Sequence, residues 1–364
     1  MNILYIAGDD PKEMGCGTQV RTHYLWKALE RVGEVSVYVI PKRQRIGFIP
    51  WLFRGFTKVG IWPFRPALDV ARLFPGVKFD CVVTRYLRNA AETAAWKIAP
   101  LYVDVDDVPL QAFELEKDRL PAGVRWLAAL VVRWWQRFIL KKCRGAWIVK
   151  EDDRRYLPRS LPCSVLRNLA KEPEVWPRPE IARENLLMTV GLMGYGPNID
   201  GVLWFLRTVW EPFHAQHPDW RYAIAGKGAP EALQQECARI GGVELLGFVD
   251  DLDALYAKSA AVVAPIMTGA GSCVKVVESA LHGRTTFVTP FAARGIPEED
   301  AAKLGFRLFD DLQSFERSFA AWIDLSDDVQ QVRELTILET AKGYNSFEQF
   351  AAVVHERMIC FLTR

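Results

Sequence analysis

The stretch NLLMTVGLMGYGPNIDGVLWFLRTVWEPFHAQHPDWRYAIAG, residues 185–226, decides the fold class. It reads as an apolar strand ending at Gly191, a glycine-containing loop, a helix over 198–217 and a second strand over 220–226. The same order occurs near the N-terminus, where a strand at 2–8 and a helix at 18–33 precede a strand at 34–40. This succession is the βαβ unit of a parallel sheet. The sequence therefore predicts an α/β protein with two doubly wound domains.

The segment 168–185 separates the two predicted domains, because it holds three prolines and many charges without sustained periodicity. Strand-like runs lie on both sides of it, at 79–85, 101–107, 146–150, 243–247, 260–266 and 285–290. We expect an N-terminal domain over 1–170 and a C-terminal domain over 171–344. Residues 345–364 are expected to form a helix that packs back toward the N-terminal domain.

Composition limits the class of protein. No apolar run reaches about 18 residues, so we expect no membrane-spanning helix. The start, MNILYIAGDD, lacks the features of a signal peptide. Seven cysteines without a CxxC pair predict reduced thiols in a cytoplasmic protein and argue against a zinc site. Residues 1–150 carry 24 Lys/Arg against 14 Asp/Glu, and the remainder carries 22 against 30. We therefore expect an anionic partner for the first half only.

Four loops of the second domain follow predicted strands and contain glycine: GLMGYGPN (191–198), GKGAP (226–230), GFVDD (247–251) and TGAGSCVKVVE (268–278). Ligands of open α/β sheets bind beyond the carboxyl ends of the strands, and glycine allows the backbone to approach them closely. A single loop of this kind is also typical of an ordinary turn. Four of them in one sheet favour a nucleotide-sugar site.

Residues 269–283, GAGSCVKVVESALHG, add charge to that edge. Three small residues lead into a predicted helix, whose first N–H groups suit a diphosphate. Lys275 and Glu278 are three positions apart, so both project from the same face of the helix. We expect Lys275 to contribute charge to the diphosphate and Glu278 to accept hydrogen bonds from a ribose diol.

The runs over 190–230 and 243–290 resemble glycosyltransferase family 4 and its GT-B relatives in the order and spacing of these motifs. The resemblance covers nearly the whole second domain. It is weaker in the first, where GCGTQVRTHYLWKALERVGEVSVYV (15–39) is similar to the family's first glycine loop and helix. It implies two Rossmann-like domains facing a cleft, with the nucleotide sugar held mainly by the second. It also implies retaining sugar transfer without a metal or other cofactor.

The resemblance assigns roles position by position. Glu278 matches the carboxylate that binds the donor ribose, and Lys275 matches a lysine common in one branch of the family. A loop beside the donor sugar and diphosphate matches Gly269, Gly271 and Ser272. Phe248 and Val249 fall where the family's backbone frames the base. Gly15 and Gly17 match the N-terminal loop that approaches the donor phosphates and the acceptor. The glycine loops add Gly194, Asn198 and Lys227 to the candidate donor-binding residues.

This chain departs from the family pattern at two places. Many members have a second glutamate eight residues before the first, where this chain has Ala270. Many also have an Arg or Lys just after the strand that ends at Gly191, and this chain has none. The cation that binds the diphosphate is then expected from Lys275, Lys227, Arg21 or Arg294.

The acidic run VDVDDVP (103–109) has three open interpretations. Asp106 lies roughly where the family often has a histidine near the transferred sugar, so it is a candidate catalytic residue that binds the acceptor or acts as a base. The run is alternatively a structural loop, or a metal site of the Asp-x-Asp kind. We expect no metal, because the run ends a strand of the first domain while the donor motifs lie in the second. For His23, packing is favoured over catalysis.

Two basic and aromatic stretches explain the positive half of the chain. Residues 42–66 include Arg54 and Trp62, and the predicted helix within 124–144 includes Arg133, Trp134 and Arg137. This combination is typical of a surface that binds an anionic membrane. The alternative is that the tryptophans pack between the domains and the cations are solvated. Nucleic acid is disfavoured, because no nucleic-acid-binding module is visible.

Together these features predict a metal-independent, retaining glycosyltransferase. It would move a sugar from a nucleoside diphosphate, UDP or GDP, to a lipid-linked or other saccharide acceptor in the assembly of a bacterial envelope polysaccharide. The protein would bind peripherally to the inner face of the plasma membrane. Two alternatives remain: an inactive GT-B scaffold that binds nucleotide sugar or lipid, and a GT-B nucleotide-sugar epimerase. A dehydrogenase is disfavoured, because no GxGxxG joins a strand to a helix.

Overall fold

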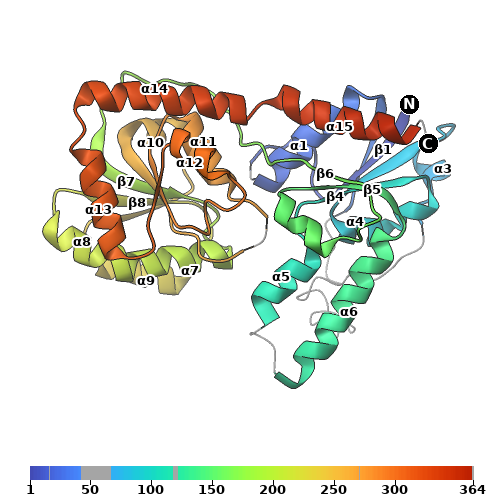
Figure 1. Ribbon diagram of the computed structural model, residues 1–364, viewed down its shortest axis with the longest axis horizontal. Helices are drawn as coiled ribbons and strands as arrows, with labels where there is room; N and C mark the ends of the chain where they lie inside the picture. The colour runs from blue at the N-terminus through green and yellow to red at the C-terminus, as the bar shows by residue number, and fades with distance from the viewer. Residues whose placement is uncertain (16, 42–66, 118–121, 270, 363–364) are drawn as a thin grey trace. The chain divides into compact units, whose positions relative to one another are not determined.

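The structure is a computed structural model that describes residues 1–15, 17–41, 67–117, 122–269 and 271–362 (Figure 1). The chain forms two compact units. Unit 1 consists of Met1–Leu169 with Ser346–Arg364, and unit 2 is Ala170–Asn345. The passage between the units falls inside the proline-containing segment 168–185. Of the helices in the described ranges, none has the length and apolar character needed to span a bilayer.

Unit 1 is built on a parallel six-stranded sheet in the order β2-β1-β3-β4-β5-β6. Its strands are β1 (Asn2–Ala7), β2 (Glu34–Val39), β3 (Cys81–Arg85), β4 (Leu101–Val105), β5 (Cys143–Ile148) and β6 (Cys163–Val165). Its longer helices are α1 (Gly17–Glu30), α4 (Tyr86–Thr93), α5 (Pro109–Glu116), α6 (Ala122–Leu140) and α15 (Phe347–Leu362). Short helical turns are α3 (Val70–Leu73), η1 (Ala95–Lys97) and η3 (Glu151–Tyr156).

The central strand β1 shows why both faces of this sheet are covered. Successive side chains of a strand point to opposite faces. Leu4 and Ile6 belong to the core that α4 and α6 cover, whereas Ile3, Tyr5 and Ala7 belong to the core shared with α1 and α15. The unbroken apolar run from Ile3 to Ala7 is therefore what a parallel sheet between two helical layers requires.

Unit 2 has a second parallel six-stranded sheet, in the order β12-β11-β10-β7-β8-β9. Its strands are β7 (Glu184–Val190), β8 (Arg221–Ala225), β9 (Val243–Gly247), β10 (Ser259–Ala264), β11 (Thr286–Val288) and β12 (Phe306–Leu308). The direction of winding reverses between β7 and β10, so the loops that follow these strands mark the switch point at the carboxyl edge. In doubly wound sheets, ligands bind at that position.

Helices cover both faces of the second sheet (Figure 1). On one face lie α7 (Gly196–Phe205), the π-helical turn η4 (Leu206–Trp210), α8 (Glu211–Gln216), α9 (Glu231–Arg239) and α13 (Leu312–Ile323). On the other lie α10 (Leu252–Lys258), α11 (Val274–Leu281), α12 (Glu298–Lys303) and α14 (Asp327–Tyr344). Leu187, Ile224 and Val263 pack on the first layer, and Met188 and Val262 on the second.

The predicted fold class is confirmed: the chain is α/β, with two doubly wound parallel sheets. Every predicted strand has a counterpart. The sequence missed β6 and β12, each three residues long at the edge of its sheet. A strand of three residues is too short to show a recognisable alternation of apolar and polar side chains. Only its pairing with the neighbouring strand defines it. It also placed β5 three residues late, because Cys143, Arg144 and Gly145 are not typical strand residues.

Candidate active site

Three glycine loops of unit 2 are joined by backbone hydrogen bonds at the carboxyl edge of the sheet. The N–H of Gly191 donates to the carbonyl of Ala225 at 3.0 Å, and the N–H of Met193 donates to that of Lys227 at 2.8 Å. The N–H of Gly226 donates to the carbonyl of Gly247 at 2.6 Å. The loops after β7, β8 and β9 therefore form one continuous backbone surface.

Gly226 shows why this surface requires glycine. Its φ is +148°, and a Cβ added there would lie 1.6 Å from the carbonyl oxygen of Gly191. Both the backbone angle and the contact exclude a side chain. The close approach of the two loops therefore depends on the absence of a Cβ at this position.

We expect Gly226→Ala to destabilise unit 2 by about 2–5 kcal/mol, because it combines a disfavoured φ with overpacking. The free energy of unfolding, measured by urea denaturation, tests this. Gly194→Ala is the matched control in the neighbouring loop, because its Cβ would lie 3.6 Å from the nearest atom, an ordinary contact. Equal losses in the two variants would contradict the close-approach explanation.

Lys275 lies in the first turn of α11 and reaches the loop after β7. Its Nζ donates to Oδ1 of Asn198 at 2.7 Å, and Nδ2 of Asn198 donates to the carbonyl of Leu192 at 2.8 Å. A Cβ on Gly191 would lie 2.8 Å from this Nζ. Burial lowers the pKa of Lys275, while Cys273 and Glu278 oppose that shift. The ammonium is thus fixed at the switch point between β7 and β10.

Glu278 lies one turn further along α11 and is half-buried. Burial raises the pKa of Glu278 to about 7, and the neighbouring Lys275 limits the rise. The N-cap residue of α11, Cys273, makes no side-chain capping hydrogen bond. α11 therefore begins without the side-chain cap that is common at helix N-termini, and its first two turns carry a cation and a carboxylate.

His282 and Asp253 fix the end of α11 to α10. Neither residue was predicted from the sequence. The His282 ring lies between two oxygens: its Nδ1 is 2.8 Å from the Glu278 carbonyl and its Nε2 is 2.9 Å from Oδ1 of Asp253. The ring also stacks on Tyr256, with centroids 3.8 Å apart. The sequence signal that could have revealed His282 is its position four residues after Glu278, because that spacing places both residues on the same helix face.

The loop before α11 lies against the start of α7. Gly269 and Gly271 have φ values of +130° and +67°. A Cβ on Gly269 would lie 3.6 Å from Pro197. Arg294 belongs to unit 2 and donates from Nη2 to the carbonyl of Gly269 at 3.4 Å, so it borders this loop. Ser272 lies on the same loop, and Ala270 lies outside the described residues.

Exposed apolar side chains line the same edge. Phe248 is 60% exposed, and the Nζ of Lys227 lies 3.8 Å from its ring centroid. Leu192 and Tyr195 are also exposed. Val249 differs from its neighbour, because it packs against the core beside α10. Phe248 thus offers an accessible face to a base, whereas Val249 is mainly a packing residue.

The acidic run of unit 1 forms a buried ion-pair network. Asp104 has no exposed side-chain surface and binds Arg21 (Nη2 to Oδ1, 2.5 Å) and Arg85 (Nη1 to Oδ2, 2.6 Å). Asp106 accepts hydrogen bonds from Arg85 at 3.1 Å and from Asn168 at 3.2 Å. Within the described ranges, no group of three or more His, Cys, Asp or Glu side chains is arranged to hold a metal ion. These contacts favour the structural interpretation of Asp104.

Other residues of unit 1 have clear positions. Arg21 is fully committed to Asp104 and to the Leu166 carbonyl, so it is not available as a diphosphate cation. Nδ1 of His23 is 2.8 Å from the Pro11 carbonyl, and its ring packs edge-on against its aromatic neighbours. Gly15 and Gly17 are exposed, and Gly17 begins α1.

The proposed membrane residues divide into two groups. Arg133, Trp134 and Arg137 are exposed on α6. Arg54 and Trp62 lie outside the described residues. The unit 2 candidates lie on the loops at the carboxyl edge of its sheet and on the first turns of α11. The candidates of unit 1 belong to a separately folded unit.

The unit 2 edge can bind a polyanion and a diol together. Lys275, Lys227 and Arg294 supply positive charge, and the start of α11 contributes its dipole. Glu278 supplies a hydrogen-bond acceptor close to the cation. This combination matches the diphosphate and ribose of a nucleotide.

Comparisons with known proteins give one family model and a set of similar structures. Residues 184–323 match the family model described as "Glycosyl transferases group 1", which covers most of unit 2. A search of curated protein sequences finds no match. Several hundred solved chains share the fold.

Three similar structures represent these matches. Sucrose-phosphate synthase (tll1590) from Thermosynechococcus elongatus has a TM-score of 0.69 at 13% identity, covering 100% of this chain and 99% of that one. Trehalose 6-phosphate synthase from Burkholderia multivorans has a TM-score of 0.66 at 12% identity and covers 100% of both chains. Anabaena Alr3699/HepE in complex with UDP and glucose has a TM-score of 0.59 at 13% identity and covers 98% of both. The chain therefore carries a group 1 glycosyl transferase domain over residues 184–323 and is a glycosyltransferase with the GT-B fold.

Proposed function

We propose that this protein transfers a sugar, with retention and without a metal, from a nucleoside diphosphate to a lipid-linked saccharide. The observation that carries the proposal is the start of α11. There Lys275 is fixed by Asn198, and Glu278 follows one turn later. The complex of the similar Anabaena protein with UDP and glucose supports UDP as the first donor to test, with GDP as the second.

Each group of the site has a defined task in this reaction. Lys275 and the N–H groups of α11 stabilise the negative charge that develops on the leaving diphosphate. Glu278 accepts hydrogen bonds from the ribose hydroxyls, and Phe248 contacts the base. Glu278 is occupied by the ribose hydroxyls in this arrangement, so it is not assigned an attack on the sugar. The leaving phosphate therefore takes the proton of the acceptor hydroxyl, and Asp106 orients the acceptor.

Peripheral binding at the inner face of the plasma membrane brings the enzyme to a lipid-linked acceptor. The exposed arginines and tryptophans of α6 support this placement. Such an acceptor is typical of the assembly of envelope polysaccharides and other glycoconjugates.

The proposal is tested by incubating the protein with radiolabelled UDP- and GDP-sugars and a membrane lipid extract, with and without EDTA. Label should enter the lipid fraction at equal rates in both conditions. A catalytically inactive scaffold, the second candidate, would bind the nucleotide in a thermal-shift assay and form no product. An epimerase would convert the donor sugar without any acceptor. No thermal shift with any nucleotide would contradict the donor site itself.

Lys275→Met should weaken donor binding by about tenfold to a hundredfold, because one charge-assisted contact to the diphosphate is lost. The dissociation constant for UDP, measured by calorimetry, tests this. Lys303→Met is the control, since Lys303 is an exposed lysine on α12 in the same unit. Unchanged affinity in Lys275→Met would remove Lys275 from the site.

A further inference from the structure

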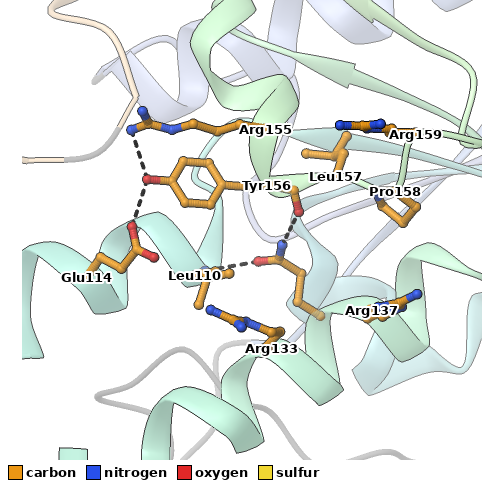
Figure 2. A pocket seen from close by; sticks show the side chains of 10 residues that line it. Leu110, Glu114, Arg133, Arg137, Arg155, Tyr156, Leu157, Pro158 and Arg159 are labelled. Carbon is orange, nitrogen blue, oxygen red and sulfur yellow. Dashed lines mark hydrogen bonds between the residues drawn. The ribbon is translucent and has the colours of Figure 1, made fainter. Parts of the chain in front are cut away.

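A pocket of unit 1 gathers four arginines that the donor site does not use. It measures about 650 Å³ and lies between α5, α6 and η3 (Figure 2). Arg133 and Arg137 come from α6, Arg155 comes from η3, and Arg159 comes from the loop that follows it. From the sequence, only Arg133 and Arg137 could be predicted to lie together, because they are one helical turn apart on the same helix.

The pocket is a built feature of the fold. Gln136 is buried and joins its three walls: its side chain accepts from the N–H of Leu110 at 2.9 Å and donates to the Tyr156 carbonyl at 2.8 Å. These bonds fix the start of α5 and the end of η3 against α6 (Figure 2). The arginines therefore extend from a rigid frame.

The pocket has an excess of positive charge. Of the described residues that line it, only Glu114 is a carboxylate. Glu114 accepts a hydrogen bond from the Tyr156 hydroxyl at 2.9 Å, and that hydroxyl accepts from Arg155 at 3.0 Å. The side chains of Arg133, Arg137 and Arg159 make no hydrogen bond or ion pair with any described residue. Guanidinium groups keep their charge at all ordinary pH values and bind phosphate oxygens in pairs. Four of them around one pocket fit a ligand with several negative charges.

The outer face of α6 indicates where that ligand resides. Trp126, Leu130 and Trp134 follow each other at intervals of four and are 63%, 52% and 60% exposed. Arg133 and Arg137 fall on the same side of the helix, between these apolar residues. The helix contains three arginines and no acidic residue. A helix with this mixture binds at the interface of an anionic membrane.

We propose that this arginine pocket binds the diphosphate group of a membrane-anchored lipid while the exposed apolar side chains of α6 enter the bilayer. The inference deepens the proposed function, on which it rests, by assigning the acceptor lipid's phosphates to Arg133, Arg137, Arg155 and Arg159. A monoanionic lipid headgroup would engage few of these donors, whereas a diphosphate offers enough oxygens for all four.

Vesicle co-sedimentation of the full chain tests the inference without requiring catalysis. Three vesicle types are compared: phosphatidylcholine alone, phosphatidylcholine with phosphatidylglycerol, and phosphatidylcholine with farnesyl diphosphate at matched surface charge. We expect the farnesyl diphosphate vesicles to bind best, and free pyrophosphate to compete. Equal binding to the two charged vesicle types would overturn the choice of a diphosphate, as would preference for an RNA oligonucleotide over all vesicles.

Two double variants locate the site. Arg133→Gln with Arg137→Gln should reduce binding to farnesyl diphosphate vesicles about tenfold to thirtyfold. Arg72→Gln with Lys78→Gln is the matched control, because it removes two exposed positive charges of unit 1 outside the pocket. Equal losses of vesicle binding in the two double variants would show that only net charge matters. That result would overturn the assignment of the pocket. Thermal melting confirms that each variant is folded.

A third variant separates the pocket from the apolar face. Trp126→Ser with Trp134→Ser should weaken binding to both charged vesicle types but leave free pyrophosphate binding unchanged. Loss of pyrophosphate binding in this variant would contradict the assignment of phosphate binding to the arginines and of bilayer insertion to the tryptophans. Donor binding at unit 2 is measured in parallel by thermal shift with UDP. A failure there with intact vesicle binding would refute the proposed function and leave the pocket assignment standing.

Discussion

Replacing Glu278 with glutamine is expected to reduce sugar transfer by about thirtyfold to a thousandfold and, at the same time, to make unit 2 more stable at pH 8. The loss follows because a carboxylate accepts stronger hydrogen bonds from two ribose hydroxyls than an amide does, a difference of roughly 2–4 kcal/mol. It should fall mainly on donor affinity. Steady-state kinetics with a UDP-sugar and calorimetry with UDP measure the two effects.

The gain in stability follows from the raised pKa of Glu278. Burial raises this pKa to about 7 from an ordinary value of 4.5. The folded state therefore retains a proton between these pH values that the unfolded chain has released, so stability falls as pH rises from 4.5 to 7. Glutamine carries no such penalty. We expect Glu278→Gln to be more stable than the wild type by roughly 1–3 kcal/mol at pH 8 and equal to it near pH 4.5.

The same ionisation predicts the pH dependence of donor binding. The carboxylate accepts stronger hydrogen bonds than the protonated acid, so affinity for UDP should rise between pH 6 and pH 8 in the wild type and stay flat in Glu278→Gln. Glu334→Gln serves as the control in these binding measurements, because Glu334 is a partly buried carboxylate of unit 2 that pairs with Arg183 and Arg284 and has no role in the candidate site. A variant at position 278 that kept full donor affinity would show that the ribose binds elsewhere.

The sequence could predict those parts of the site that lie close together in the chain. Lys275 and Glu278 are three residues apart, so helical geometry alone puts them on one face. The glycine loops follow recognisable apolar strands, which places them at one edge of a parallel sheet. The strand order then brings the loop after β7 beside the loop before α11, as the predicted doubly wound topology requires.

What the sequence could not predict depends on partners distant in the chain. Asn198 fixes Lys275 from 77 positions away, and Asp253 meets His282 across 29. Arg155 and Arg159 join Arg133 and Arg137 only because Gln136 fixes η3 on α6. Local periodicity carries no information about such pairs, since each depends on how two elements pack.

The acidic run of unit 1 illustrates the same limit. From the sequence, VDVDD was compatible with an acceptor base, a structural loop or a metal site. The two arginines that bind Asp104 come from α1 and from the end of β3, 83 and 19 positions away. Each residue by itself is unremarkable in sequence. Only the folded sheet shows that the carboxylate between them already has two cationic partners.

Asp104→Asn is therefore expected to destabilise unit 1 by about 3–5 kcal/mol, because it leaves two buried guanidinium groups without their shared counter-charge. Burial alone would raise the pKa of Asp104, but Arg21 and Arg85 lower it below its ordinary value of 3.8. Its contribution to stability is thus present above pH 3.8 and is lost as pH falls below that value. Urea denaturation at pH 7 gives the free energy of unfolding.

Glu348→Gln is the matched control for this prediction. Glu348 is also held by two nitrogens of one arginine, Arg31, at 2.6 and 2.8 Å, but its side chain is 76% exposed. Solvent screens an exposed pair, which therefore contributes little to stability, so this variant should unfold close to the wild type. Unfolding with and without Mg²⁺ or Mn²⁺ completes the test: a metal site at 103–109 would give a metal-dependent stabilisation that Asp104→Asn removes. If Asp104 instead acts as a buried ion-pair partner, Asp104→Asn lowers the free energy of unfolding by a large amount, and divalent cations do not change that loss.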